Sequence, residues 1–250
     1  MVDAVIPDRA RAFATCREAQ EAVVAHLRAA ARTALRARGR FLLALSGGAT
    51  PGPVFARLGH GPDPVDWGRV HLAWVDERAV PPSDPRSNFG SAWRHGIADL
   101  PVPPAQIHRI HGEERPLSVA RDRYERDLSD LFGGPPAGPG RGFDAVLLGV
   151  GPDGHTASLF PGAASLSAEG RWTVEEPNPA QEPRVPRISL TLPALRSAAQ
   201  RIFLVCGAEK RPILDRIRAP SPGAAPLPAA TVGAMSPSYW FVDAAAAPEG

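Results

Sequence analysis

Short apolar segments that show no alternation of polar and apolar residues recur along the chain, and they constrain its fold more than any other feature. The clearest are FLLAL (41–45), VHLAWVDE (70–77), FDAVLLGVG (143–151), RIFLVCG (201–207) and SYWFVD (238–243). Segments of this kind are typical of strands in a parallel sheet, because helices cover both faces of such a sheet.

Helical patterns separate these apolar segments. The spacing of apolar residues predicts a helix over 15–38 that ends at Gly39, and Pro51 suits the first turn of a second helix. Further helices are expected from about Asn88, over 117–132 and over 208–218, with additional strands at 106–110 and 187–192. The alternation predicts an α/β fold, a doubly wound, mostly parallel sheet with helices on both faces.

Composition limits the class of protein. The 24 glycines and 29 prolines among 250 residues are numerous, but a 44% hydrophobic content favours a folded chain, expected here as one domain over 1–250 with 133–142 as an internal loop. A net charge of +2 does not suggest a nucleic-acid or membrane surface. Cys16 and Cys206 are too few for a disulfide framework or a zinc ribbon. No apolar run is long enough to span a bilayer and no signal peptide is evident, so a soluble, cytoplasmic protein is expected.

The turn SGGATP (46–51) follows the first apolar strand. Ligands of open α/β sheets bind beyond the carboxyl ends of the strands. Gly47 and Gly48 allow close approach of backbone N–H groups to a ligand, and Ser46 and Thr50 add hydroxyl donors. The turn therefore suits a phosphate, although it lacks the Gly-Lys-Ser/Thr of a P-loop, and a plain strand-to-helix turn is the alternative.

Charged residues lie at the ends of three other predicted strands. Asp76 and Glu77 end the 70–77 segment and Arg78 follows it, Arg187 begins 187–192, and Lys210 follows 201–207. Lys210 is the only lysine among 28 basic residues, so a compact point charge stands where this chain otherwise uses arginine. A surface ion-pair cluster is the alternative for residues 76–78, but the shared position at strand ends favours a site for an anionic substrate.

The segment GVGPDGHTASLFPG (149–162) is the most informative turn. A buried strand runs into Gly149, Gly151 and Gly154, and Asp153 and His155 belong to the same turn. A histidine is suited to act as a general base near neutral pH. The glycine spacing matches G-x-G-x-x-G, but no acidic residue ends a following strand, so a dinucleotide site is not indicated.

Taken in order, SGGATP, VDERAVPPSDPRSN, FDAVLLGVGPDGHTASLFPG, RISLTLPAL and GAEKRPIL resemble the motifs of the 6-phosphogluconolactonase family, over about 15–243. The resemblance implies hydrolysis of 6-phosphoglucono-1,5-lactone to 6-phosphogluconate, the second step of the oxidative pentose phosphate pathway. It also implies a modified Rossmann-like fold shared with glucosamine-6-phosphate deaminases, no required metal or organic cofactor, and a monomer whose partner is a small sugar phosphate.

The resemblance and the chemistry of lactone hydrolysis together assign roles. His155 is expected to activate water as a general base, and Asp153 or Asp76 to orient its imidazole. Backbone N–H groups of the turn that holds Gly149, Gly151 and Gly154 are candidate oxyanion donors. The expected phosphate site comprises Ser46, Gly47, Gly48, Thr50, Arg78, Arg187 and Lys210, and Arg78 is alternatively expected at the developing carboxylate. Ser46 has no evident base partner, which disfavours a covalent acyl-enzyme.

Two alternatives have sequence tests. The resemblance implies that a sugar-phosphate isomerase or deaminase of the same fold usually carries Asp-Glu-Tyr at 76–78 and a glutamate shortly after the histidine. Here ASLFPG (157–162) has no acid. A non-catalytic sugar-phosphate sensor in a transcriptional regulator needs a DNA-binding segment, but residues 1–40 contain one long helix and no helix-turn-helix. The sequence therefore favours the lactonase.

Overall fold

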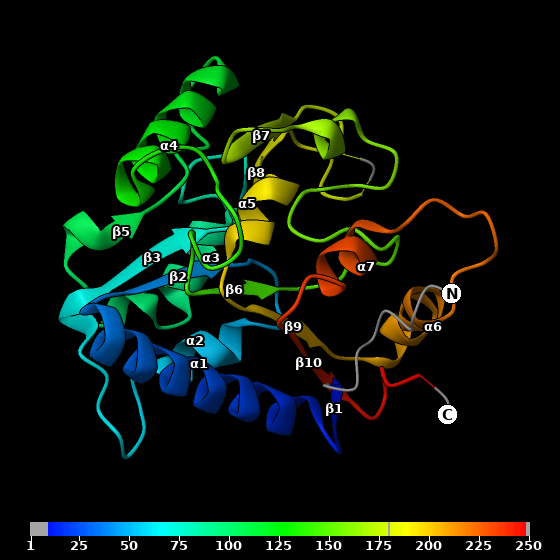
Figure 1. The fold of residues 1–250 in the computed structure, drawn as a ribbon, viewed down its shortest axis with the longest axis horizontal. Coiled ribbons are helices and arrows are strands. Elements are labelled where there is room, and N and C mark those ends of the chain that lie inside the picture. Colours follow the sequence, from blue (N-terminus) through cyan, green and yellow to red (C-terminus); the bar gives the residue numbers. More distant parts are fainter. Residues whose placement is uncertain (1–9, 180, 249–250) are drawn as a thin grey trace.

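The computed structural model describes residues 10–179 and 181–248, and a seven-stranded parallel sheet forms its centre (Figure 1). Its strands are β1 (Ala10–Phe13), β2 (Phe41–Leu45), β3 (Val70–Trp74), β5 (Ile107–His108), β6 (Ala145–Leu148), β9 (Arg201–Val205) and β10 (Ser238–Asp243). The spatial order is β1-β10-β9-β6-β2-β3-β5, and all neighbouring strands are parallel. The predicted mostly parallel sheet is confirmed.

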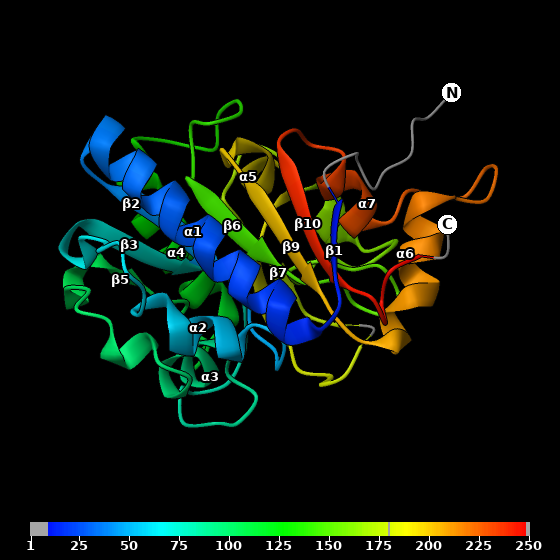
Figure 2. The same cartoon turned by 90° about the horizontal axis from the view of Figure 1, so that it is seen from below.

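Helices lie on both faces of this sheet, as predicted. They are α1 (Cys16–Arg38), α2 (Gly52–Leu58), α3 (Asn88–Arg94), α4 (Leu117–Phe132), α5 (Leu192–Ser197), α6 (Arg211–Arg218) and α7 (Pro228–Gly233). In Figure 1, α1 and α2 lie below the sheet and α4 and α5 above it, and Figure 2 shows α1 crossing the strands. Helix α1 begins where the Thr15 side chain accepts a hydrogen bond from Glu18 N–H, and it ends at Gly39, whose φ of 71° suits glycine.

A second sheet of three antiparallel strands corrects part of the prediction. It contains β4 (Asp76–Arg78), β7 (Thr173–Glu176) and β8 (Arg187–Leu190), in the order β4-β8-β7. The expected strand over 187–192 therefore belongs to this sheet and ends early, because Thr191 is the N-cap of α5 and Pro193 suits its first turn. In the β4–β8 pair Arg78 lies opposite Arg187, so two predicted site arginines become neighbours.

Other elements lay outside the prediction. Strands β1 and β7 and helix α7 were not expected from the sequence. The two cysteines, too few for a framework, nevertheless form a single disulfide across 190 residues of sequence. Within the described residues, no helix is both long and apolar enough to cross a membrane.

The topology places a binding site between β2 and β6. From β2 the chain adds β3 and β5 on one side, and from β6 it adds β9 and β10 on the other. Strands β2 and β6 pair directly, through Leu43 with Ala145 and Ala44 with Val146. The order of strands therefore reverses at this pair, and ligands of open α/β sheets bind at the carboxyl ends of strands that flank such a reversal.

Candidate active site

A cavity of about 280 Å³ opens at the carboxyl ends of β2, β6 and β9. All of the predicted site residues except Asp153 and Gly154 line it: Ser46, Gly47, Gly48, Thr50, Asp76, Arg78, Gly149, Gly151, His155, Arg187 and Lys210. Four of the predicted site segments follow β2, β3, β6 and β9, whose carboxyl ends share one edge of the parallel sheet, and Arg187 comes from β8 of the second sheet.

Asp153 contacts the His155 imidazole from behind the pocket wall. Its Oδ1 lies 2.6 Å from Nδ1 of His155 and also accepts the His155 backbone N–H at 3.1 Å. Burial raises the pKa of Asp153, but the hydrogen bond and charge of His155 outweigh burial and hold this pKa below its usual value. An ionised Asp153 favours the tautomer with the proton on Nδ1, which leaves Nε2 as the acceptor.

Asp76, the other candidate to orient the imidazole, has different partners. Its Oδ2 accepts the Ser158 hydroxyl at 2.6 Å, and its Oδ1 accepts Nδ2 of Asn88 at 3.1 Å. Asp76 is buried, and these hydrogen bonds fix Asn88, which lines the pocket, and the buried Ser158. Of the two carboxylates, Asp153 is the one that the structure places against His155.

Glycine is required at two positions of the histidine turn. A Cβ on Gly151 would lie 2.1 Å from Nδ1 and Cε1 of His155, so the imidazole packs where any side chain would stand. Gly154 has a φ of 90°, which favours glycine. The Gly151 N–H donates to the His155 carbonyl and the Gly154 N–H to the Gly151 carbonyl, both at 2.9 Å. These two N–H groups, expected as oxyanion donors, are therefore used within the turn.

Arg187 connects the second sheet with the histidine. Its guanidinium carbon lies 5.3 Å from the centre of the Phe160 ring, and that ring lies 4.6 Å from the His155 ring. Burial holds the pKa of Arg187 below its usual value, although the negative charge of Asp76 raises it. The side chain is only 2% exposed, so its positive charge acts in a poorly solvated setting.

Lys210 and Arg78 supply two further positive charges. Lys210 ends a short 3-10 helix, η5 (Ala208–Lys210), and its Nζ donates to the Val150 carbonyl at 2.9 Å. Arg78 Nη1 donates to the Arg86 carbonyl at 2.6 Å. Together with Arg187 these side chains make the pocket cationic, which suits an anionic substrate.

A family model described as "Glucosamine-6-phosphate isomerases/6-phosphogluconolactonase" matches residues 14–240. The chain belongs to this family. A protein named 6-phosphogluconolactonase from Nostoc sp. (strain PCC 7120 / SAG 25.82 / UTEX 2576) is 36% identical over 217 residues, which are 87% of this chain and 88% of that protein.

Solved structures agree with the fold. A 6-phosphogluconolactonase from Thermotoga maritima matches with a TM-score of 0.78 and 29% identity, over 94% of this chain and 97% of that one. A monomeric glucosamine-6-phosphate deaminase matches with the same TM-score at 19% identity, over 95% and 98% of the two chains. At that identity the second match shows the common fold alone.

Asn88 lies in the candidate site but was not among the site residues predicted from the sequence. It lines the pocket, and its Nδ2 donates to both the backbone and the side chain of Asp76. Its buried Oδ1 has no hydrogen-bond partner among the described residues. A Cβ on Gly47 would lie 1.8 Å from this oxygen, so glycine at 47 makes room for it. One sequence feature could have indicated Asn88. After the loop that follows a strand of the site, a serine suited to be an N-cap precedes an asparagine at a helix start.

Glu77 lies behind the pocket and anchors the loop that carries Asn88. Its carboxylate accepts the Arg78, Asn88 and Phe89 backbone N–H groups at 2.7–2.8 Å and the Ser87 hydroxyl at 2.9 Å. Burial raises the pKa of Glu77 to about 7, against these four hydrogen bonds, which lower it. The middle residue of Asp76-Glu77-Arg78 therefore supports its neighbours from inside the protein.

Proposed function

We propose that this chain hydrolyses 6-phosphoglucono-1,5-lactone to 6-phosphogluconate, the second step of the oxidative pentose phosphate pathway. The observation that carries the proposal is the Asp153–His155 pair, 2.6 Å apart, on the wall of a cationic pocket. Relatives named 6-phosphogluconolactonase, at 36% identity over most of both chains, support it.

His155 acts as the general base of the proposed reaction. Nε2 takes a proton from water as the water oxygen attacks the lactone carbonyl, and the Asp153 carboxylate stabilises the imidazolium that forms. The tetrahedral intermediate then collapses, and the bond between the carbonyl carbon and the ring oxygen breaks. The imidazolium returns its proton to that oxygen, which leaves as a hydroxyl of the open-chain product.

Positive charge serves the two ends of the substrate. We place the 46–50 turn, Arg78 and Lys210 at the phosphate, because they line the pocket and supply hydroxyl, backbone and cationic donors. The sequence predicted Arg187 at the phosphate. We instead place it at the reacting carbonyl, because it shares Phe160 with His155 and because Gly151 and Gly154 use their N–H groups elsewhere. Gly149 N–H stays a candidate oxyanion donor beside it.

The deaminase alternative lacks an acid in the right place. Ring opening of an amino sugar needs a proton donor near the histidine, but residues 156–162 contain no carboxylate.

We also propose that residues 1–250 act as one domain and as a monomer in the cytoplasm. Size-exclusion chromatography with light scattering tests the monomer.

The test uses freshly generated lactone and the purified protein. We expect release of 6-phosphogluconate far above the spontaneous rate, and no release of ammonia from glucosamine 6-phosphate. Ammonia release would support the deaminase, and binding of 6-phosphogluconate without turnover would support the non-catalytic sensor.

A further inference from the structure

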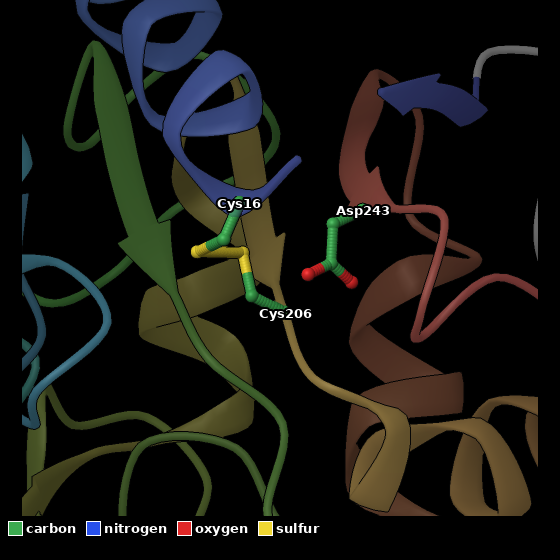
Figure 3. Close-up of side chains that lie close together, drawn as sticks. All are labelled: Cys16, Cys206 and Asp243. Carbon is green, nitrogen blue, oxygen red and sulfur yellow. A yellow bond between two sulfur atoms is a disulfide. The ribbon is translucent and has the colours of Figure 1, made fainter. Parts of the chain in front are cut away.

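A disulfide joins the start of α1 to the segment that follows β9. Cys16 is the first residue of α1, and Cys206 directly follows the last residue of β9. Figure 3 shows the two sulfurs beside the carboxylate of Asp243, the last residue of β10, and the ligand atoms of all three residues lie within 4.8 Å of one another. Three distant parts of the sequence thus meet at one point.

The disulfide borders the pocket. Cys206 itself lines the pocket, and the next residue, Gly207, donates its N–H to the two carboxylate oxygens of Asp243 at 3.1 and 3.2 Å. Gly207 has a φ of 101°, a conformation that favours glycine. The segment after β9 is therefore held on one side by the disulfide and on the other by Asp243.

Lys210 belongs to the same short segment. Its backbone N–H donates to the Gly207 carbonyl at 2.9 Å, and its Nζ reaches Val150 of the histidine turn. Only three residues lie between Cys206 and the lysine that we place at the substrate phosphate. One short turn of backbone, closed by this backbone hydrogen bond, therefore connects Cys206 to Lys210.

We propose that the Cys16–Cys206 disulfide is a site of reversible thiol–disulfide exchange with dithiol reductants, and that reducing it weakens the binding of the substrate phosphate by Lys210. The second half of this proposal rests on the proposed function. The first half concerns the disulfide alone.

The two cysteines differ in access to a reductant. Cys16 is partly exposed, whereas Cys206 is only 8% exposed. A thiolate of the reductant attacks the Cys16 sulfur, the Cys16–Cys206 bond breaks, and Cys206 leaves as a thiolate that takes up a proton beside the negative Asp243. The second thiol of the reductant attacks the mixed disulfide and releases Cys16. The reductant becomes a cyclic disulfide, and the protein gains two electrons and two protons.

The experiment compares oxidised protein with protein treated with dithiothreitol, both with EDTA so that no metal ion binds the thiols. Thiols are counted after unfolding, and KM and kcat are measured with 6-phosphoglucono-1,5-lactone. We expect no free thiols before treatment and two after it, with KM raised about fivefold or more and kcat changed less than twofold. Cys16→Ser should show the higher KM in both conditions, and Lys210→Ala should show no redox change in KM.

Two free thiols in the protein before treatment with dithiothreitol would overturn the proposal, as would equal KM values before and after treatment. A redox-dependent KM in Cys16→Ser would overturn it as well. If neither form has lactonase activity, the proposed function fails instead. Calorimetric titration with 6-phosphogluconate then still tests the inference, since weaker binding to the reduced protein supports it and equal binding contradicts it.

Discussion

Asp153 Oδ1 lies 2.6 Å from Nδ1 of His155, two residues further along one turn, so the proposed base and the group that we propose to orient it come from a single local structure. The other carboxylate of the pocket, Asp76, instead binds Ser158 and Asn88. The two carboxylates that the sequence could not tell apart therefore have separate tasks, one at the imidazole and one at the pocket floor.

Asp153→Asn tests the first of these tasks. Asparagine keeps the size of the side chain but removes the charge that stabilises the imidazolium, so kcat should fall by about 10- to 10³-fold while KM changes little. The measurement is steady-state hydrolysis, corrected for spontaneous opening of the lactone. A variant that keeps more than half of the kcat would show that Asp153 does not assist the base.

Lys210→Ala and Arg187→Ala form a matched pair. Loss of a charge-assisted hydrogen bond of roughly 1.5–3 kcal/mol corresponds to about a 10- to 150-fold loss of kcat/KM. Lys210→Ala should show this loss, mainly in KM, with the phosphorylated lactone and almost none with unphosphorylated gluconolactone. Arg187→Ala should lose activity with both lactones, because we place it at the carbonyl. The reverse pattern would exchange the two assignments.

Gly151→Ala should disable the enzyme without unfolding it. The added methyl group would occupy the space of the His155 ring, so the imidazole must move and kcat should fall by at least about tenfold. Gly138→Ala is the control, because Gly138 lies outside the pocket and a Cβ at that position meets no atom within 4 Å. Equal kinetic losses in the two variants would mean that the position of the imidazole is not what matters.

Glu77→Gln tests the buried carboxyl through stability. The pKa of Glu77 is raised from 4.5 to about 7, so the native state holds a proton that the unfolded state has lost between these pH values. Binding this proton more tightly stabilises the native state. The stabilisation is fully present below about pH 4.5 and is lost as the pH rises through 7. Urea unfolding should therefore show that the free energy of unfolding of Glu77→Gln rises by about 3 kcal/mol, relative to that of the unmutated protein, between pH 4.5 and 8. A constant difference would contradict the raised pKa.

The sequence predicted the parts of the fold and the site that depend on local pattern. Uninterrupted apolar strands identified the parallel sheet, and polar or glycine-rich turns at their carboxyl ends identified the pocket. It did not predict the antiparallel pairing of Asp76–Arg78 with Arg187–Ser189, because three-residue strands carry little periodicity. The Cys16–Cys206 bond escaped prediction for a related reason, since its partners are 190 residues apart.

The central claim is that His155 is the base that activates water, and the most direct measurement is the kcat of His155→Ala with freshly generated 6-phosphoglucono-1,5-lactone. After subtraction of spontaneous hydrolysis, we predict a kcat lower by about 10²- to 10⁴-fold with KM nearly unchanged, since the imidazole does not hold the phosphate. A variant that retains more than half of the kcat would contradict the account.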